Sequence, residues 1–196
     1  MLRIRPADRP GDLGWVVQAH GEQYAQEFGW DVTFEALVAQ IVGDYGTAHD
    51  PAREQGWIAE LAGERVGCVF CVAQDDETAQ LRILLVTPSA RGSGVGSALV
   101  RRCVDFARQA GYRRMVLWTN DVLVAARRIY EASGFRLETE DRHRSFGQDL
   151  VGQTWGLDLR PTSRRRTASP VATAPTVAPA PAAPSNPTRA ARRPVR

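Results

Sequence analysis

The sequence of 196 residues contains no lysine, so all 25 of its basic residues are arginine. A nucleotide-binding P-loop needs a Gly-Lys pair before Ser or Thr, and the absence of lysine excludes that class. The three cysteines, an odd number, argue against a disulfide framework. No apolar run has the length that spans a bilayer, and the N-terminal MLRIRPADRP lacks an apolar signal region. We therefore expect a cytoplasmic protein with no membrane partner.

Two of the cysteines, Cys68 and Cys71, form a C-x-x-C pair. This spacing is typical of zinc sites when a second pair accompanies it, and the sequence has no second pair. The pair lies in VGCVFCVA, whose composition indicates a strand, and positions three apart in a strand face opposite sides. We therefore predict that both cysteines pack in the core and that the chain binds no metal.

The composition changes at residue 161. Residues 161–196 hold eight of the twelve prolines, seven of the 25 arginines and no acid, so residues 1–160 carry 18 basic and 22 acidic residues, a net charge of −4. A segment so poor in apolar residues buries too little surface to offset its ordering entropy. We predict one folded domain at 1–160 and a disordered tail at 161–196, whose arginines we expect to be solvated rather than bound to nucleic acid.

Residues 81–111 run from an apolar strand through a glycine-rich turn into an amphipathic helix. The apolar run at 83–86 is typical of a strand buried on both faces, and Pro88 ends it. Apolar residues recur after the turn at helical spacing, at Val95, Leu99, Cys103, Phe106 and Ala110. Free amides at such a turn favour phosphate oxygens, and Arg91 adds a forked donor. The stretch therefore predicts an anion site.

The turn reads G-x-G-x-G, which differs from the dinucleotide fingerprint G-x-G-x-x-G. VTPSARGSGVGSALV instead resembles the acyl-CoA pyrophosphate loop of the GNAT (GCN5-related) N-acetyltransferases, Arg/Gln-x-x-Gly-x-Gly/Ala, with Arg91, Gly94 and Gly96 at those places. NDVLVAARRIYEASGF at 120–135 resembles the family's segment in which an asparagine ends a strand and a helix closes with Tyr-Glu-x-x-Gly-Phe. The resemblance covers roughly residues 2–160.

The resemblance implies the α/β (α+β) GNAT fold. It consists of a mixed, mostly antiparallel sheet of about six to seven strands flanked by about four helices, with a V-shaped splay between the fourth and fifth strands. The apolar patterns predict helices that begin near residues 12, 33, 95 and 122, the last capped by Asn120 or Asp121. They predict strands at 2–5, 57–61, 65–73, 81–86, 114–119, 135–140 and 153–159.

The resemblance also implies site residues. Tyr130 would protonate or hydrogen-bond the departing thiolate of the co-substrate acetyl-CoA. The residues expected to hold acetyl-CoA are Leu84, Leu85, Val86, Arg91, Gly92, Ser93, Gly94, Val95, Gly96, Ser97, Asn120 and Arg127. In this family the first helical pair covers the acceptor side, so the candidates for substrate contacts are His20, Glu22, Tyr24, Glu27 and Trp30.

The resemblance implies that the protein is an N-acetyltransferase, an acyltransferase that transfers the acetyl group of acetyl-CoA to a primary amine. The amine attacks the thioester carbonyl directly. The acceptor stays open among a small amine, an amino acid, an antibiotic and a protein N-terminus. The general base is equally open: it is a water chain or one of Glu22, Glu27, Glu60, Asp121 and His143. We also expect a bacterial source, from the exclusive use of arginine, and a possible homodimer.

The alternative function is a non-catalytic acyl-CoA sensor. GDLGW, HGEQY, LWTND and GQTWGLDL resemble the subgroup of GNAT domains found behind MarR-type winged-helix regulators. No winged helix precedes Leu2 in this sequence, so we do not expect DNA binding.

Overall fold

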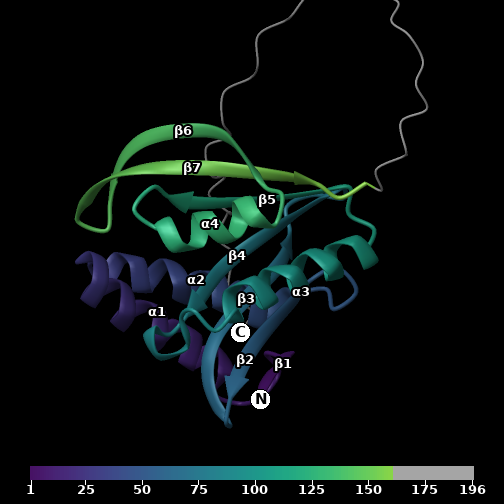
Figure 1. Cartoon of the computed structure of the whole chain (residues 1–196), viewed down its shortest axis with the longest axis horizontal. Helices are drawn as coiled ribbons and strands as arrows, with labels where there is room; N and C mark the ends of the chain where they lie inside the picture. The colour runs from purple at the N-terminus through teal and green to yellow at the C-terminus, as the bar shows by residue number, and fades with distance from the viewer. Residues whose placement is uncertain (161–196) are drawn as a thin grey trace, which may run out of the picture. The chain divides into compact units, whose positions relative to one another are not determined.

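The computed structural model describes residues 1–160, and the predicted tail lies outside the described residues. The described part is a seven-stranded sheet with helices on both faces (Figure 1). In chain order the elements are β1 (Leu2–Pro6), α1 (Asp12–Phe28), α2 (Val32–Ala48), β2 (Gln55–Leu61), β3 (Glu64–Ala73), β4 (Thr78–Val86), the short helix η1 (Pro88–Ala90), α3 (Val95–Gln109), β5 (Arg114–Asn120), α4 (Val124–Ala132), β6 (Arg136–Ser145) and β7 (Gln148–Asp158).

The sheet has the order β1-β2-β3-β4-β5-β7-β6, and β4 with β5 is its parallel pair. These two strands are paired only from Thr78 with Arg114 to Leu81 with Leu117. Beyond Leu81 the strand β4 runs on to Val86 without pairing to β5, so the two strands diverge. The mixed α/β sheet and the predicted splay between the fourth and fifth strands are confirmed.

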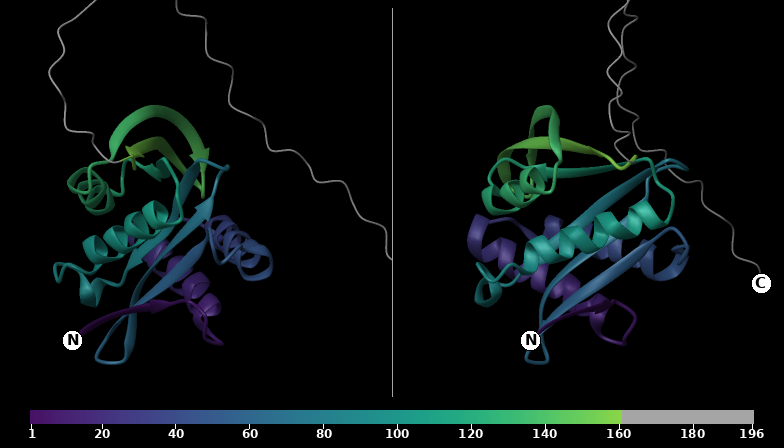
Figure 2. Two further views of the ribbon diagram at one scale, coloured as in Figure 1. Left: turned by 90° about the vertical axis from the view of Figure 1, so that its right-hand side faces the viewer. Right: turned by 45° about the vertical axis from the view of Figure 1, so that its right-hand side comes forward.

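Two apolar cores lie on opposite faces of the sheet. Helices α1 and α2 cover one face, and α3 and α4 cover the other (Figure 2). Cys68 packs in the core under α1 and α2, whereas Cys71 packs in the core under α3. Both are buried free thiols on opposite faces of β3, as the sequence predicts, and this geometry does not bring them together.

A β-bulge in β4 changes which side chains face which core. Ile83 has φ +46°, in the left-handed region that a β-branched residue rarely adopts. Leu81 and Leu84 both pack in the core under α3, although three positions apart in a regular strand face opposite sides. Leu85 therefore points into the core under α1 and α2. The extra residue shifts the alternation by one position and opens β4 toward the splay.

Three predictions of local structure are wrong. The run at 83–86 is not buried on both faces, because it borders the splay, and Leu85 is its one buried side chain. Helix α4 begins after Leu123, because Asn120 remains in β5 and Asp121 accepts from the backbone N–H of Val151 at 3.3 Å. Strands β6 and β7 form one long hairpin that turns at 146–147, where the sequence predicts two shorter strands.

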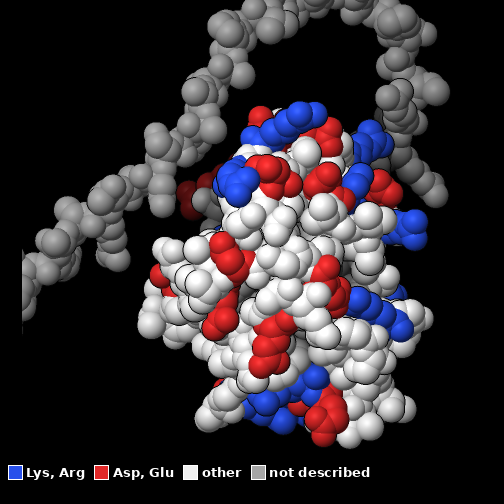
Figure 3. Space-filling view, turned by 90° about the vertical axis from the view of Figure 1, so that its left-hand side faces the viewer, with Lys and Arg blue, Asp and Glu red and all other residues white. Residues whose placement is uncertain are grey.

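Charged side chains of both signs are mixed on one face of the described part (Figure 3). On the face drawn in Figure 3, acidic groups and arginines stand between uncharged side chains, and neither sign forms a continuous surface. None of the helices within residues 1–160 has the length and hydropathy needed to cross a bilayer.

Candidate active site

Two adjoining cavities lie where β4 and β5 separate. The outer cleft has a volume of about 570 Å³ and is lined by Gln23, Tyr24, Glu27, Phe28, Leu84–Val86, Ala90–Gly92, Gly94–Ser97, Val122–Ala126 and Ile129. The inner pocket, of about 120 Å³, is lined by His20, Tyr24, Trp30, Phe34, Leu37, Val38, Ile41, Gln80–Leu84, Trp118–Asn120, Leu123 and Tyr130. Tyr24, Leu84 and Leu123 line both, so the two spaces meet there.

The N-terminus of α3 lies in the outer cleft. Gly94 takes the N-cap position with φ +83°, and no side chain caps the helix. The first helical hydrogen bond runs from the amide of Ala98 to the carbonyl of Gly94 at 3.0 Å, so the amides of residues 95–97 have no partner within the helix. These groups and the positive end of the helix dipole favour an anion in the cleft.

Gly96 differs from the other glycines of the turn, because close packing rather than a positive φ disfavours a side chain at this position. A Cβ at this position would lie 2.6 Å from Cδ1 of Ile129 on α4. By contrast, a Cβ on Gly92 or Gly94 would meet nothing within 4 Å, but both residues have positive φ. The glycine pattern therefore serves two purposes, because it sets the turn and it lets α4 approach the start of α3.

Arg91 is held across the outer cleft by α1. Its Nη2 lies 2.6 Å from Oε1 of Glu27, and both side chains are partly exposed. An anion in the cleft would compete with Glu27 for the Arg91 guanidinium. Arg91 and the amides of α3 together make the cleft suited to phosphate groups.

Strand β4 offers backbone groups to the outer cleft. Its pairing with β5 ends at Leu81, so the backbone that follows has no strand partner on that side within residues 1–160. The side-chain amide of Gln23 on α1 donates to the carbonyl of Val86 at 3.3 Å. An extended ligand lying in the splay would find free backbone donors and acceptors here.

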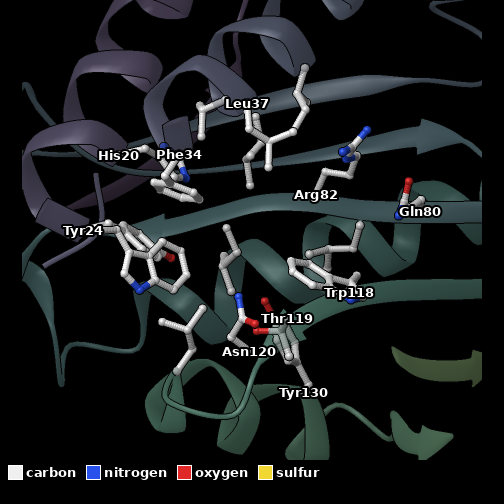
Figure 4. Close-up of a pocket in the computed structure, with 17 residues that line it drawn as sticks. His20, Tyr24, Phe34, Leu37, Gln80, Arg82, Trp118, Thr119, Asn120 and Tyr130 are labelled. Carbon is white, nitrogen blue, oxygen red and sulfur yellow. The ribbon is translucent and has the colours of Figure 1, made fainter. Parts of the chain in front are cut away.

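Tyr130 enters the inner pocket from α4 and is 5% exposed (Figure 4). Burial raises the pKa of its hydroxyl well above the ordinary value, and the nearby hydroxyl of Tyr24 adds to the rise. Burial likewise raises the pKa of Tyr24. Both phenols are therefore neutral hydrogen-bond donors at any working pH.

Asn120, at the end of β5, is 1% exposed and lines the inner pocket. Its Oδ1 accepts from Nε2 of His143 on β6 at 2.9 Å, and Nδ1 of His143 lies 3.0 Å from Oγ of Ser145. Because the carbonyl oxygen of Asn120 is occupied by His143, its amide NH₂ is the group left for the pocket. The β6–β7 hairpin thus orients a residue of β5.

His20 on α1 is 1% exposed and lies at the edge of the inner pocket. Nδ1 of His20 donates to the carbonyl of Val16 at 2.8 Å, which leaves Nε2 as an acceptor. This buried nitrogen has no hydrogen-bond partner within residues 1–160. Burial lowers the pKa of His20 to about 4, so the ring is neutral at pH 7.

None of the five residues named as candidate bases lines the inner pocket. Glu27 pairs with Arg91, and Asp121 accepts from Val151. Glu60 accepts from Nε of Arg5 at 2.6 Å in a buried network, while His143 reaches the pocket only through Asn120. Glu22 is exposed and accepts from Gln18 at 2.9 Å.

The structure divides the predicted site residues among three places. Those in the outer cleft are Leu84, Leu85, Val86, Arg91, Gly92, Gly94, Val95, Gly96, Ser97, Tyr24 and Glu27. Those in the inner pocket are Tyr130, Asn120, His20 and Trp30, with Tyr24 and Leu84 shared. Ser93, Glu22 and Arg127 line neither, and Arg127 donates to the carbonyl of Asp121 at 3.0 Å.

Sequence reasoning missed Gln23, Gln80, Arg82 and Trp118 among the lining residues. Gln80 and Arg82 do carry a signal, because they alternate with Ala79 and Leu81 along β4, and alternating polar residues mark one face of a strand.

This fold and site combine an outer cleft suited to phosphate groups with a small adjoining pocket, at the point where β4 and β5 separate. The chain belongs to the acetyltransferase (GNAT) family, which it matches over residues 15–135.

Relatives of known sequence agree with this assignment. The chain is 32% identical over 122 residues to an N-acetyltransferase of Schizosaccharomyces pombe, an alignment that covers 59% of this chain and 71% of that protein. It is 43% identical over 88 residues to N-acetylaspartate synthetase of Danio rerio, covering 43% of this chain and 31% of the relative. The chain thus spans less than a third of that relative's length.

Solved structures share the fold. The structure of yncA from Salmonella typhimurium with its cofactor acetyl-CoA has a TM-score of 0.66 at 18% identity, covering 86% of this chain and 99% of that chain. The ribosomal-protein-S18-alanine N-acetyltransferase from Escherichia coli has a TM-score of 0.62 at 21% identity, covering 83% and 97%.

Proposed function

We propose that this protein transfers the acetyl group of acetyl-CoA to a primary amine by direct attack. One observation carries the proposal: the outer cleft, suited to phosphates, meets the inner pocket at Tyr24, Leu84 and Leu123, beside the buried Tyr130. Membership of the acetyltransferase family supports it. The relatives named for N-acetylaspartate support a small molecule as the acceptor.

The residues of the outer cleft fit acetyl-CoA. Arg91 and the amides of residues 95–97 would hold the diphosphate, and the free backbone of β4 near Leu84, Leu85 and Val86 would hold the pantetheine arm. Gly92 and Gly94 leave this surface without side chains. When bound, acetyl-CoA supplies a thioester, whose carbonyl carbon the amine attacks and whose thiolate then departs.

Tyr130 is the residue we assign to the departing thiolate. Since burial raises its pKa further above that of a thiol, full proton transfer from the phenol is uphill. Tyr130 therefore acts by donating a hydrogen bond as negative charge grows on sulfur, an interaction that strengthens in the transition state.

We place the acceptor amine in the inner pocket, which meets the outer cleft at Tyr24, Leu84 and Leu123. No carboxylate lines this pocket, so we assign deprotonation of the ammonium group to water rather than to Glu22, Glu27, Glu60, Asp121 or His143. Asn120, held by His143, presents its amide NH₂ as a positioning donor.

We further propose that residues 1–160 are the catalytic domain of a bacterial, cytoplasmic enzyme that forms a homodimer and does not bind nucleic acid. The mixed charge on the face in Figure 3 supports the last point. The resemblance of GDLGW and LWTND to regulator-fused domains supports an acyl-CoA sensor as the alternative. The position of Tyr130 in the inner pocket favours the enzyme.

A calorimetric titration of acetyl-CoA, followed on the same sample by thiol release against a panel of amines, tests the proposal. We expect binding and amine-dependent thiol release. Binding without release on any amine would favour the sensor, and no binding would overturn the assignment of the outer cleft.

A further inference from the structure

Arg82 is a charged residue that the proposed reaction does not use. It lies in the middle of β4, within a sequence that is otherwise apolar, LRILLV. Its side chain is half-buried and lines the inner pocket (Figure 4). Burying half of a guanidinium in a sheet costs desolvation free energy unless a hydrogen-bonding or anionic group offsets it. The position of Arg82 therefore indicates that such a group binds it.

Within residues 1–160 Arg82 has no such partner. It forms no ion pair within 4 Å and donates no hydrogen bond among the contacts of the described chain. The negative charge of Asp44 on α2 acts on the Arg82 guanidinium at a distance, without an ion pair or hydrogen bond between the two side chains. Nearly all other arginines of the site region are paired or bonded, as Arg91 is with Glu27 and Arg127 is with Asp121.

The side chains that line the inner pocket carry charge of one sign only, which is positive. Arg82 is the one ionised side chain there at pH 7, because His20 is neutral and no carboxylate lines the pocket. The remaining polar groups, among them Gln80, Thr119 and Asn120, are uncharged. A cationic amine alone would meet only repulsion here, whereas an amine that also carries an anionic group would be attracted.

Arg82 lies close in the chain to the place where the two cavities meet. Leu84, which lines both cavities, follows it by two residues on β4. A group bound by the Arg82 guanidinium therefore belongs to the same small molecule as the amine that faces this junction. The pocket volume of about 120 Å³ suits an acceptor that is a small molecule.

We propose that the acceptor is an amino acid, and that Arg82 binds its carboxylate while the amino group of the same molecule faces the junction at Leu84. The planar guanidinium offers two parallel N–H donors, which match the two oxygens of a carboxylate. Arg82 is thus a specificity-determining residue for the acceptor. This inference rests on the proposed acetyl transfer and names its substrate class.

The test compares L-amino acids with their C-terminal amides as acceptors, using the full-length protein, acetyl-CoA and thiol release. Each amide keeps the size and the amino group of its acid and removes only the negative charge. The variants are Arg82→Gln and the matched control Arg3→Gln, which removes an exposed arginine from β1 at the far edge of the sheet. Acetyl-CoA affinity, measured by calorimetry, shows whether each variant is folded.

We expect kcat/KM of the wild type and of Arg3→Gln to be at least about 30-fold higher for the acids than for the amides. A factor of this size, about 30-fold, corresponds to the loss of a charge-assisted, bidentate pair of hydrogen bonds. Arg82→Gln should reduce that preference to within about threefold, mainly through KM for the acceptor, with unchanged acetyl-CoA affinity. Equal rates on acids and amides in the wild type would overturn the inference and leave acetyl transfer standing.

A second measurement does not depend on turnover. We expect at least one of the amino acids tested to bind to the CoA-saturated protein, and its Kd to rise at least about tenfold in Arg82→Gln. If no amine is acetylated but this binding and its loss are seen, the proposed function is wrong and the carboxylate site is retained. If the Kd is the same in both proteins, the carboxylate site is wrong.

Discussion

At the residue scale, the inner pocket depends on a few buried polar groups with defined partners. Asn120 is fixed by His143, and Nδ1 of His20 by Val16, whereas the hydroxyl of Tyr130 has no protein partner within residues 1–160. A donor held at a pocket wall without a partner is available to a ligand. These groups lead to two predictions.

Replacing Tyr130 with Phe should lower kcat by about 10- to 100-fold, because a hydrogen bond to a developing anion is lost. The Kd for acetyl-CoA should stay within about twofold, since Tyr130 does not line the outer cleft. Tyr112→Phe is the matched control, because its hydroxyl donates to the carbonyl of Arg53 at 3.0 Å, outside both cavities. Stopped-flow thiol release and calorimetry measure the two quantities. Equal losses in kcat and affinity would refute the assignment.

His20 should make the protein less stable in acid. Its pKa falls from 6.5 in the unfolded chain to about 4 in the folded protein, so between these values the unfolded state binds the proton. The free energy of unfolding should fall from pH 6.5 to pH 4 by up to about 3 kcal/mol through this group, and His20 has no such effect above pH 6.5.

Urea denaturation at pH 7.5 and pH 4.5 of the wild type and His20→Leu measures this contribution. The variant should lose less stability than the wild type on acidification. A variant whose loss on acidification equals that of the wild type would show that His20 is not the group responsible.

Sequence patterns identified residues at this scale unevenly. Tyr130 and Asn120 follow from the resemblance of residues 120–135 to a GNAT segment, and both line the inner pocket. Arg82 was missed because its alternation with Leu81 marks a polar strand face but not a pocket. The splay beside it depends on the bulge at Ile83, where a β-branched residue takes a positive φ against its intrinsic preference. The sequence around Ile83 contains no signal that predicts this backbone conformation.

At the scale of elements, the site is formed where α1, β4 and the start of α3 meet. The ion pair between Glu27 and Arg91 joins α1 to the turn before α3. Because both side chains are partly exposed, the pair contributes little to stability, and its larger effect is on the anion that the cleft can bind.

Substitutions in this pair should change acetyl-CoA affinity in opposite directions. Arg91→Gln should raise the Kd about tenfold by removing a phosphate donor, and Glu27→Gln should lower it by about two- to fivefold by freeing Arg91. Calorimetry at low ionic strength measures both, with Asp105→Gln, which breaks the exposed pair with Arg108 on α3, as control. A weaker affinity in Glu27→Gln would show that Glu27 supports binding rather than competing with it.

Elements with strong periodicity were predicted well, and the others were not. Helices α1, α2 and α3 follow from their apolar stripes, and the β2–β3 hairpin follows from its composition. Strand β6 could not be delimited, because its side chains are almost all exposed and RLETEDRHRS has no alternation of period two. The turn at Phe146 and Gly147, both with positive φ, gave no composition signal beyond one glycine.

At the scale of the whole molecule, the charge is divided along the chain. Residues 1–160 carry a net charge of −4, and the arginines of residues 161–196 bring the total to +3. All residues that line the two cavities lie between His20 and Tyr130. The predicted disordered tail falls outside the described residues, so it stays a prediction.

Truncation after Arg160 should therefore leave kcat and the Kd for acetyl-CoA within about twofold of the full-length values. The same two proteins should show equally weak binding to duplex DNA at physiological salt. A salt-sensitive DNA affinity that the truncation removes would instead make the tail a nucleic-acid-binding segment.

The order of the elements and the splay between β4 and β5 were predictable, because the resemblance of the glycine turn and of residues 120–135 to GNAT segments implies them. The separation of the site into an outer cleft and an inner pocket was not, because it depends on side chains from α1, α2 and β5 that meet only in the folded sheet.

Mass spectrometry of the reaction with carbon-13-labelled acetyl-CoA and a panel of amino acids tests the central claim most directly. Acetyl transfer by direct attack predicts one labelled acetyl group on the amino nitrogen for each thiol released. Thiol release that yields free labelled acetate, or label found on the protein instead of the amine, would contradict it.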